Sequence, residues 1–226
     1  MSQSNPLTDI KLFADAVPQA LFNKLYEAVS SPEDGRLKNK SSYSTTFWFP
    51  RDAPATNIAE ETITKLSTNL DLPGNCIGAE WWLGRLRYGK KLNYHFDRDL
   101  ALSRETGESV FPLMGSILYL NAFPSAPTVI LDQVPRPDGK SKVPAVSKLS
   151  VSVEAIPNQY VTYPGSLRHG VIPNLDKMQS NEPEPQDESK LRLTFLVNYW
   201  HRRPSAPICR DYDGSIYPSL GQKFAA

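Results

Sequence analysis

Hydrophobic residues near the start of the chain recur with the spacing of an amphipathic helix. Within residues 18–30, apolar Leu21, Leu25 and Val29 return at every fourth position, which predicts a helix that buries one face. The segment 43–49, further along, is predicted to be a strand. The amino-terminal part of the chain is therefore expected to be helical, with one strand lying between two helices.

The second of these helices is predicted from about Asn57 to Leu70. Asn57 can cap free backbone N–H groups, and Glu60 stands three residues later, as a capping box requires. A rough apolar stripe supports the same helix and runs through Ile58, Ile63, Leu66 and Leu70. These helices are expected to flank the strand-rich region that follows them.

From Glu80 onward the pattern changes to short segments rich in β-branched and aromatic residues, separated by Gly, Pro and Asp. Eight strands are predicted, near residues 80–88, 92–97, 115–121, 127–132, 148–154, 159–163, 168–172 and 191–200. Eight strands fit a double-sheet jelly roll. The expected fold is mainly β with flanking α, a double-stranded β-helix (jelly roll) core with N-terminal supporting helices.

The chain is long enough for one sizeable core and too short for two comfortable domains. Residues 1–226 are therefore expected to form a single domain. Within it we expect a helical flank with a covering strand (1–78), the β-helix core (79–203) and a C-terminal tail (204–226). The polar stretches 135–144 and 174–189 are predicted to be surface loops.

The composition of the chain indicates which kinds of partner and which cell compartment to expect. The chain has 25 basic and 24 acidic residues, so a nucleic-acid partner is not expected. Cys76 and Cys209 are too few for a disulfide scaffold and fit a reducing compartment. Residues 1–13 lack the pattern of a secretory signal, and the most apolar stretch, 110–123, is interrupted and too short to cross a bilayer. A cytoplasmic protein without a membrane span is expected, with its oligomeric state left open.

Metal-binding chemistry is suggested by the chain's histidines, of which there are three. The first lies in Asn93-Tyr94-His95-Phe96-Asp97, and alternation along a strand would place His95 and Asp97 on one face. A neutral imidazole and a carboxylate suit a borderline divalent metal, and His169 is the natural third ligand from a distant strand. Three protein ligands on one face of an octahedron leave three positions for exogenous ligands.

The strand that ends the predicted core adds a candidate anion site. Even-numbered residues of 190–200 share one face, so Arg192 and Thr194 are expected to point the same way. A buried arginine needs an anionic partner, and guanidinium pairs with a carboxylate in a planar, two-pronged manner. A dicarboxylate ligand would supply that partner.

An ordered series of motifs in residues 87–200, about half the chain, resembles the Fe(II)/2-oxoglutarate-dependent dioxygenases, especially the prolyl-hydroxylase-like branch. The matching segments are Arg87-Tyr88-Gly89 leading into Tyr94-His95-Phe96-Asp97, then Gly115 to Asn121, Gly165 to Val171, and Arg192-x-Thr194. One segment departs from the family, because Thr128-Val129-Ile130-Leu131 stands where a Gly-Gly-Glu-Thr sequence is usual.

The resemblance implies Fe(II) bound by His95, Asp97 and His169. It also implies 2-oxoglutarate as cosubstrate, with its far carboxylate on Arg192 and with Tyr119, Thr194 and Tyr88 as further contacts. The implied reaction is hydroxylation of an unactivated C–H bond with release of succinate and CO2, and ascorbate is left open as a supporting reductant. Related halogenating enzymes have a small residue where this chain has Asp97, so hydroxylation is preferred over halogenation.

Other interpretations of these residues remain open. A His-x-Asp sequence by itself arises readily by chance, and Arg192 could form a surface ion pair with Glu182, Glu184 or Asp187. The chain could be a non-catalytic jelly-roll binding module without iron, or a cupin-like metalloenzyme that needs no 2-oxoglutarate. A peptide or protein residue and a small amino-acid-like metabolite are nearly equal as substrates. The segments 43–52, 98–109 and 174–189 are the expected specificity loops.

Overall fold

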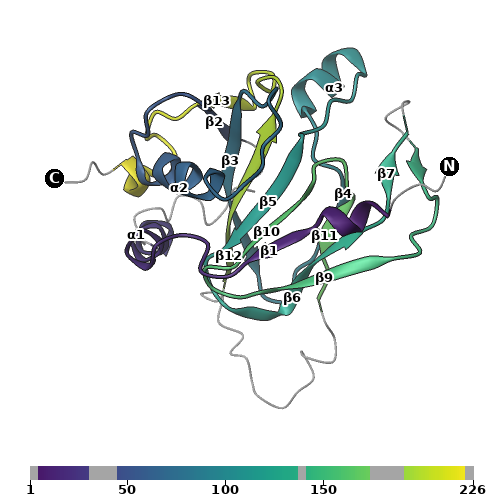
Figure 1. Cartoon of the computed structure of the whole chain (residues 1–226), viewed down its shortest axis with the longest axis horizontal. Helices are drawn as coiled ribbons and strands as arrows, with labels where there is room; N and C mark the ends of the chain where they lie inside the picture. The colour runs from purple at the N-terminus through teal and green to yellow at the C-terminus, as the bar shows by residue number, and fades with distance from the viewer. Residues whose placement is uncertain (1–4, 31–44, 137–140, 174–190, 222–226) are drawn as a thin grey trace.

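The computed structural model describes residues 5–30, 45–136, 141–173 and 191–221, and Figure 1 shows their arrangement. The helices are η1 (Pro6–Asp9), α1 (Gln19–Ser30), α2 (Ile58–Ser67), α3 (Leu100–Thr106) and η4 (Pro218–Gly221). The strands are β1 (Lys11–Phe13), β2 (Thr46–Pro50), β3 (Gly78–Arg87), β4 (Leu92–His95), β5 (Met114–Tyr119), β6 (Phe123–Leu131), β7 (Val134–Pro135), β8 (Lys142–Val143), β9 (Ser150–Ala155), β10 (Tyr160–Pro164), β11 (His169–Val171), β12 (Leu191–Trp200) and β13 (Cys209–Asp211).

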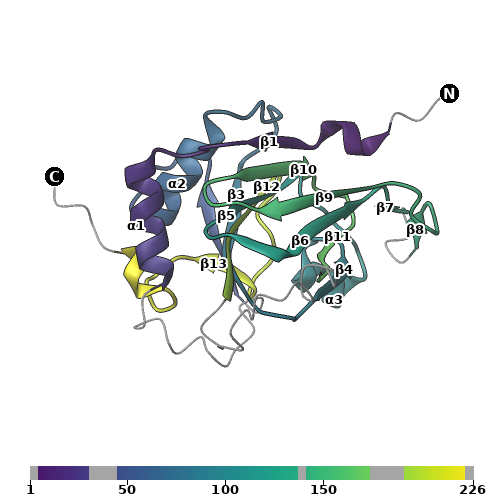
Figure 2. The ribbon, with the colours of Figure 1, turned by 90° about the horizontal axis from the view of Figure 1, so that it is seen from below.

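Two facing sheets form the core, and the predicted jelly roll is confirmed. The larger sheet has the order β1-β10-β5-β12-β3-β2-β13 and the smaller one β4-β11-β6-β9. All eight predicted core strands are present. Along the chain β3, β5, β10 and β12 enter the larger sheet, while β4, β6, β9 and β11 enter the smaller one. The sheets do not close into a barrel, and Figure 2 shows the smaller sheet lying on one side of the larger.

The larger sheet separates two hydrophobic cores. One core lies between this sheet and the two long helices, and it includes Leu25 of α1 and Phe195 of β12. The other fills the space between the sheets and includes Tyr119 and Leu196. Figures 1 and 2 both show α1 and α2 on the face of the larger sheet that points away from the smaller one. The inner core therefore lies on the side of the larger sheet that faces the smaller sheet, away from the helices.

Both predicted helices are present, with small differences at their ends. Leu21, Leu25 and Val29 of α1 are buried, as their spacing predicts. Asn57 caps α2 by accepting a hydrogen bond from the Glu60 backbone N–H at 3.0 Å. The Glu60 carboxylate accepts from the backbone N–H and the hydroxyl of the preceding Thr56, at 2.7 and 2.8 Å, which extends the capping box by one residue. The helix ends at Ser67, before the predicted Leu70.

Several elements differ from the sequence expectation. The second core strand ends at His95, so Asp97 lies beyond it. Helix α3 lies in the segment expected to be a loop, capped by Asp99 and ended by Gly107 in the left-handed region. It buries none of its residues, so it has no apolar stripe for periodicity to reveal. The predicted loop 135–144 contains the hairpin β7–β8, with residues 137–140 outside the described part.

Some of the predicted segments lie outside the described residues. Residues 43–44 of the predicted strand and the whole loop 174–189 lie outside the described residues, and so do Glu182, Glu184 and Asp187. In the described ranges, no helix has the length and apolar character needed to cross a bilayer. Cys76 and Cys209 are both buried and unbridged.

Candidate metal centre

Three side chains converge at the edge of the smaller sheet. The antiparallel register of β11 and β4 places His169 opposite His95, with ring centroids 4.5 Å apart. Asp97 follows β4 and reaches both rings: its Oδ1 lies 3.4 Å from His95 Nε2, and its Oδ2 lies 3.7 Å from His169 Nε2. The three possible ligand atoms lie within 4.8 Å of one another. The structure therefore brings the predicted ligand set together.

Backbone carbonyls orient both imidazoles. His95 Nδ1 lies 2.8 Å from the carbonyl oxygen of Asn93, and His169 Nδ1 lies 3.0 Å from that of Leu167. A carbonyl only accepts hydrogen bonds, so each Nδ1 carries a proton, and in the neutral form of each ring Nε2 keeps a lone pair. Those lone pairs belong to the nitrogen atoms nearest Asp97. Such outer hydrogen bonds fix the ring orientation of a metal-binding histidine.

The carboxylate of Asp97 is held in its ionised form. Burial alone would raise its pKa, but the neighbouring His169, the His95 hydrogen bond and an amide hydrogen bond from Asn198 hold the pKa well below its usual range. Asn198 Nδ2 donates to Asp97 Oδ2 at 3.1 Å. An ionised carboxylate together with two imidazoles in their neutral form is the donor set that a divalent metal needs.

The two histidines differ in their response to protons. Burial lowers the pKa of His169. Burial also acts to lower the pKa of His95, but the hydrogen bond and charge of Asp97 outweigh it and raise that pKa. His169 is 4% exposed, whereas the His95 side chain is 37% exposed. His169 is therefore available as a neutral ligand over the wider pH range.

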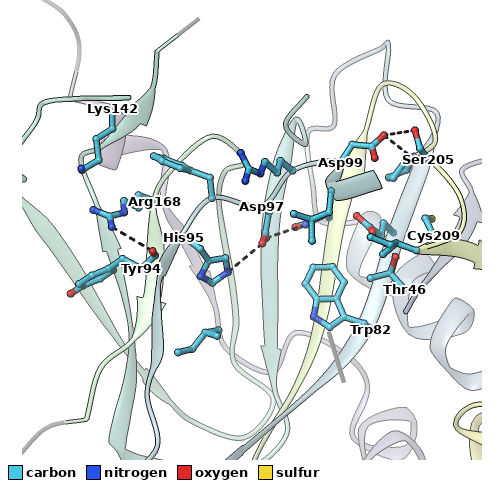
Figure 3. A pocket seen from close by; sticks show the side chains of 18 residues that line it. Thr46, Trp82, Tyr94, His95, Asp97, Asp99, Lys142, Arg168, Ser205 and Cys209 are labelled. Atoms are coloured by element: carbon cyan, nitrogen blue, oxygen red, sulfur yellow. Dashed lines mark hydrogen bonds and ion pairs between the residues drawn. The ribbon is translucent and has the colours of Figure 1, made fainter. Parts of the chain in front are cut away.

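A cavity of about 600 Å³ opens beside these residues and is lined by His95, Asp97 and Asn198 among others. Figure 3 shows His95 and Asp97 near its middle, with Arg168 and Lys142 toward one side and Asp99 and Ser205 toward the other. A metal on this cluster would thus face open space, unlike a closed structural site.

Arg192 lies in the interior between the sheets, on the face of β12 that the alternation predicts. It is 4% exposed, and its Nη2 donates to the Thr128 hydroxyl at 2.7 Å. The Tyr119 hydroxyl also donates to Thr128 Oγ1, at 2.8 Å, and the Arg192 Cζ lies 5.3 Å from the Tyr119 ring centroid. Thr194 is buried and stands opposite Tyr119 in the strand register. Three of the four predicted cosubstrate contacts therefore lie together.

Strand register relates this cluster to the metal ligands. On β6, Thr128 is opposite Val171, and Ile130 is opposite His169. Two residues along a strand span about 6.6 Å, so Thr128 lies about that far along β6 from the residue opposite His169.

Tyr88, the fourth predicted contact, packs against Phe123 with ring centroids 6.3 Å apart, at the margin of the inner core.

Four polar residues of this region were not predicted as site residues. Asn198 lies on the same face of β12 as Arg192, so alternation could have identified it. The Tyr163 hydroxyl lies 3.4 Å from His169 Nε2, and Thr128 joins Arg192 to Tyr119. Glu80 is buried in the cavity wall. For Tyr163, Thr128 and Glu80, strand alternation by itself does not indicate which distant residue each would contact.

Comparisons with known proteins give no sequence relative. No protein-family profile and no curated protein sequence matches the chain. Among solved structures, a Pseudomonas putida prolyl-4-hydroxylase matches at 15% identity and TM-score 0.49, covering 86% of this chain and 95% of that one. A Trichoplax adhaerens prolyl hydroxylase in complex with a hypoxia inducible factor peptide fragment matches at 12% identity and TM-score 0.47, covering 87% and 86%.

A non-heme alpha-ketoglutarate-dependent epimerase from nogalamycin biosynthesis matches at 10% identity and TM-score 0.46, covering 84% of this chain and 78% of that one.

Proposed function

We propose that this chain, as one domain, is an Fe(II)- and 2-oxoglutarate-dependent oxygenase with His95, Asp97 and His169 as the iron ligands. It hydroxylates an unactivated C–H bond of a peptide or protein residue or of a small amino-acid-like metabolite, and it releases succinate and CO2. The observation that carries the proposal is the convergence of two Nε2 lone pairs and one ionised carboxylate beside an open cavity.

The donor set fits iron(II). Ligand atoms about 2.1 Å from one ion are separated from each other by roughly 3 to 3.5 Å. Asp97 approaches His95 Nε2 at 3.4 Å through Oδ1 and His169 Nε2 at 3.7 Å through Oδ2, and both separations are close to that range. Two imidazoles and one carboxylate, with further positions open, form the facial triad of non-heme iron oxygenases. When bound, iron supplies the activation of oxygen that is coupled to decarboxylation of 2-oxoglutarate.

The protein's own residues position the reactants. Asn198 holds the Asp97 carboxylate, and the carbonyls of Asn93 and Leu167 hold the two rings. In this proposal Arg192 pairs with the far carboxylate of 2-oxoglutarate, since its guanidinium is buried about two strand residues from the level of His169. Tyr119 and Thr194 border that carboxylate, and Tyr88 contributes from the margin of the inner core.

The test is an anaerobic titration of metal-free protein with Fe(II) and then with 2-oxoglutarate, following the weak visible charge-transfer band of the chelate. The His169→Ala variant is expected to lose the band. The Arg192→Gln variant is expected to keep its iron affinity and to bind 2-oxoglutarate at least about tenfold more weakly, because a charged hydrogen bond is lost. Unchanged cosubstrate affinity in this variant would place the anchor on another residue.

Two other results of this titration would contradict the proposal and favour a different function. A response to iron without any response to 2-oxoglutarate would favour a cupin-like metalloenzyme, and no response to iron would favour a non-catalytic binding module. Succinate release over pools of peptides and metabolites, measured with and without ascorbate, then identifies the substrate. We also propose a cytoplasmic location, because a reducing compartment fits the two unbridged thiols.

A further inference from the structure

Three cations that the proposed chemistry does not use line the cavity, and two of them, Arg168 and Lys142, lie together on one side of it; the third is Arg98. Arg168 and Lys142 line the same cavity as His95 and Asp97. Figure 3 shows both on the side where Tyr94 lies, away from Asp99 and Ser205. The charge of Arg168 is close enough to His95 to act on the pKa of that histidine. The two cations therefore border the space in which a substrate would meet the metal.

The guanidinium of Arg168 is fixed in place by neutral partners. Its Nη1 donates to Gln133 Oε1 at 2.9 Å, and its Nη2 lies 3.5 Å from the Tyr94 carbonyl oxygen. Gln133 is 2% exposed and donates its own amide to the carbonyls of Pro144 and Ala145, which turns its oxygen toward Arg168. A guanidinium held in this way loses little conformational entropy when it binds an anion.

The acidic groups of the cavity are engaged elsewhere. Asp97 lies against the two histidines, and Asp99 accepts hydrogen bonds from Ser205 and lies 3.9 Å from Arg202. Glu80 accepts a hydrogen bond from Thr46 at 2.6 Å. In residues 5–30, 45–136, 141–173 and 191–221, no carboxylate forms an ion pair with Arg168 or Lys142. This wall of the cavity thus presents positive charge that its described neighbours do not neutralise.

The lining of the cavity also contains apolar side chains. The apolar lining residues are Trp82, Leu92, Phe96, Leu100, Pro204, Ile208 and Cys209. A ligand that fits such a space has an apolar body and one anionic group, because the few polar groups of a pocket fix orientation while apolar walls supply contact. A guanidinium fork pairs in a bidentate manner with a carboxylate or a phosphate, and of these the carboxylate is the smaller group and carries the single charge of the ligand described above.

We propose that Arg168 and Lys142 determine substrate specificity by binding a carboxylate on a substrate with an apolar body, which orients that body toward His95, Asp97 and His169. This inference rests on the proposed function for the reaction itself, but the carboxylate site needs no metal. It also separates two anion sites, with the substrate on Arg168 and Lys142 and the cosubstrate on Arg192.

The test uses benzoate and its neutral isostere benzamide as probes, titrated by calorimetry into the full chain. Titrations are run on metal-free protein and on anaerobic protein loaded with Fe(II) and 2-oxoglutarate. Benzoate is expected to bind about tenfold more tightly than benzamide, as a charged hydrogen-bonded pair implies. The Arg168→Gln and Lys142→Gln variants are expected to lose this preference. Arg104→Gln and Lys148→Gln, which change exposed cations outside the cavity lining, are expected to keep it.

A second set of titrations distinguishes two sources of the carboxylate, the C-terminus of a peptide and a small organic acid. A short acetylated peptide ending in phenylalanine is compared with its C-terminal amide. A preference for the free acid larger than that shown by benzoate assigns the site to a peptide terminus, and a smaller one assigns it to a small acid. Both results require the preference to disappear in Arg168→Gln, with Lys142→Gln as the second variant should the first fail to fold.

Three results would overturn the inference. Equal affinity for benzoate and benzamide would show that the cations do not select charge, and absence of benzoate binding would show that no carboxylate site exists. Loss of 2-oxoglutarate affinity in Arg168→Gln, with Arg192→Gln unaffected, would make Arg168 the cosubstrate anchor. If the iron chelate fails to form but metal-free protein still prefers benzoate, the proposed oxygenase is wrong and the carboxylate site stands.

Discussion

Glu80 provides a quantitative test of the electrostatics of the cavity. It lies on β3, is 7% exposed and accepts a hydrogen bond from Thr46. Burial raises its pKa from the ordinary 4.5 to about 7, the Thr46 hydrogen bond opposes that change, and the charges of Asp97 and Asp99 add to it. The ionised form of Glu80 therefore destabilises the folded state.

The sign and size of the effect follow from linkage. When the pKa of an acid is raised in the folded state, its contribution to stability is fully present below the unfolded pKa and is lost as the pH rises through the folded pKa. The step from 4.5 to about 7 corresponds to about 3 kcal/mol of folding free energy. Glu80→Gln removes the ionisation, so the variant is expected to gain stability relative to the natural protein as the pH rises.

Urea unfolding of metal-free protein at about pH 5 and about pH 8 measures this gain. The difference in unfolding free energy between Glu80→Gln and the natural chain is expected to grow by about 2 kcal/mol between the two pH values. Glu108→Gln, at an exposed glutamate, serves as the control and is expected to show no such growth. A Glu80→Gln difference that is the same at both pH values would refute the assignment of a buried, proton-binding Glu80.

Three further substitutions test the packing and hydrogen bonds of the site. In Gly170→Ala the new Cβ would lie 2.7 Å from the Leu92 carbonyl oxygen, so β11 must move away from β4. The free energy of unfolding, measured in urea, is expected to fall by about 1–3 kcal/mol, and Fe(II) titration is expected to show weaker iron binding. Asn198→Ala removes the hydrogen bond to the proposed carboxylate ligand, and iron affinity is expected to fall about 10- to 100-fold while 2-oxoglutarate still binds the iron-loaded form. Thr128→Val removes the hydroxyl shared by the buried arginine and tyrosine, so 2-oxoglutarate binding should weaken about tenfold with iron affinity retained. Unchanged iron affinity in Gly170→Ala or in Asn198→Ala would contradict the contact that the substitution changes. Unchanged 2-oxoglutarate affinity in Thr128→Val would contradict the role of the Thr128 hydroxyl.

The sequence by itself was sufficient for the elements whose signals are local. The fourfold spacing of Leu21, Leu25 and Val29 predicts α1, and Asn57 marks the start of α2, because helix periodicity and caps depend on neighbours within one or two turns. Alternation along residues 190–200 also predicts that Arg192 and Thr194 point the same way, since the side-chain period of a strand is two.

Tertiary structure alone decided which distant side chains meet. Asp97 reaches the two histidines from beyond the end of β4, so the strand alternation that suggested it does not explain its position. The fixing of Arg168 by Gln133 joins residues 35 positions apart, and the hydrogen bond between Thr128 and Arg192 spans 64 positions. The physical reason is that sheet register and loop paths are set by packing over the whole fold, whereas a local pattern specifies only the face on which a side chain lies.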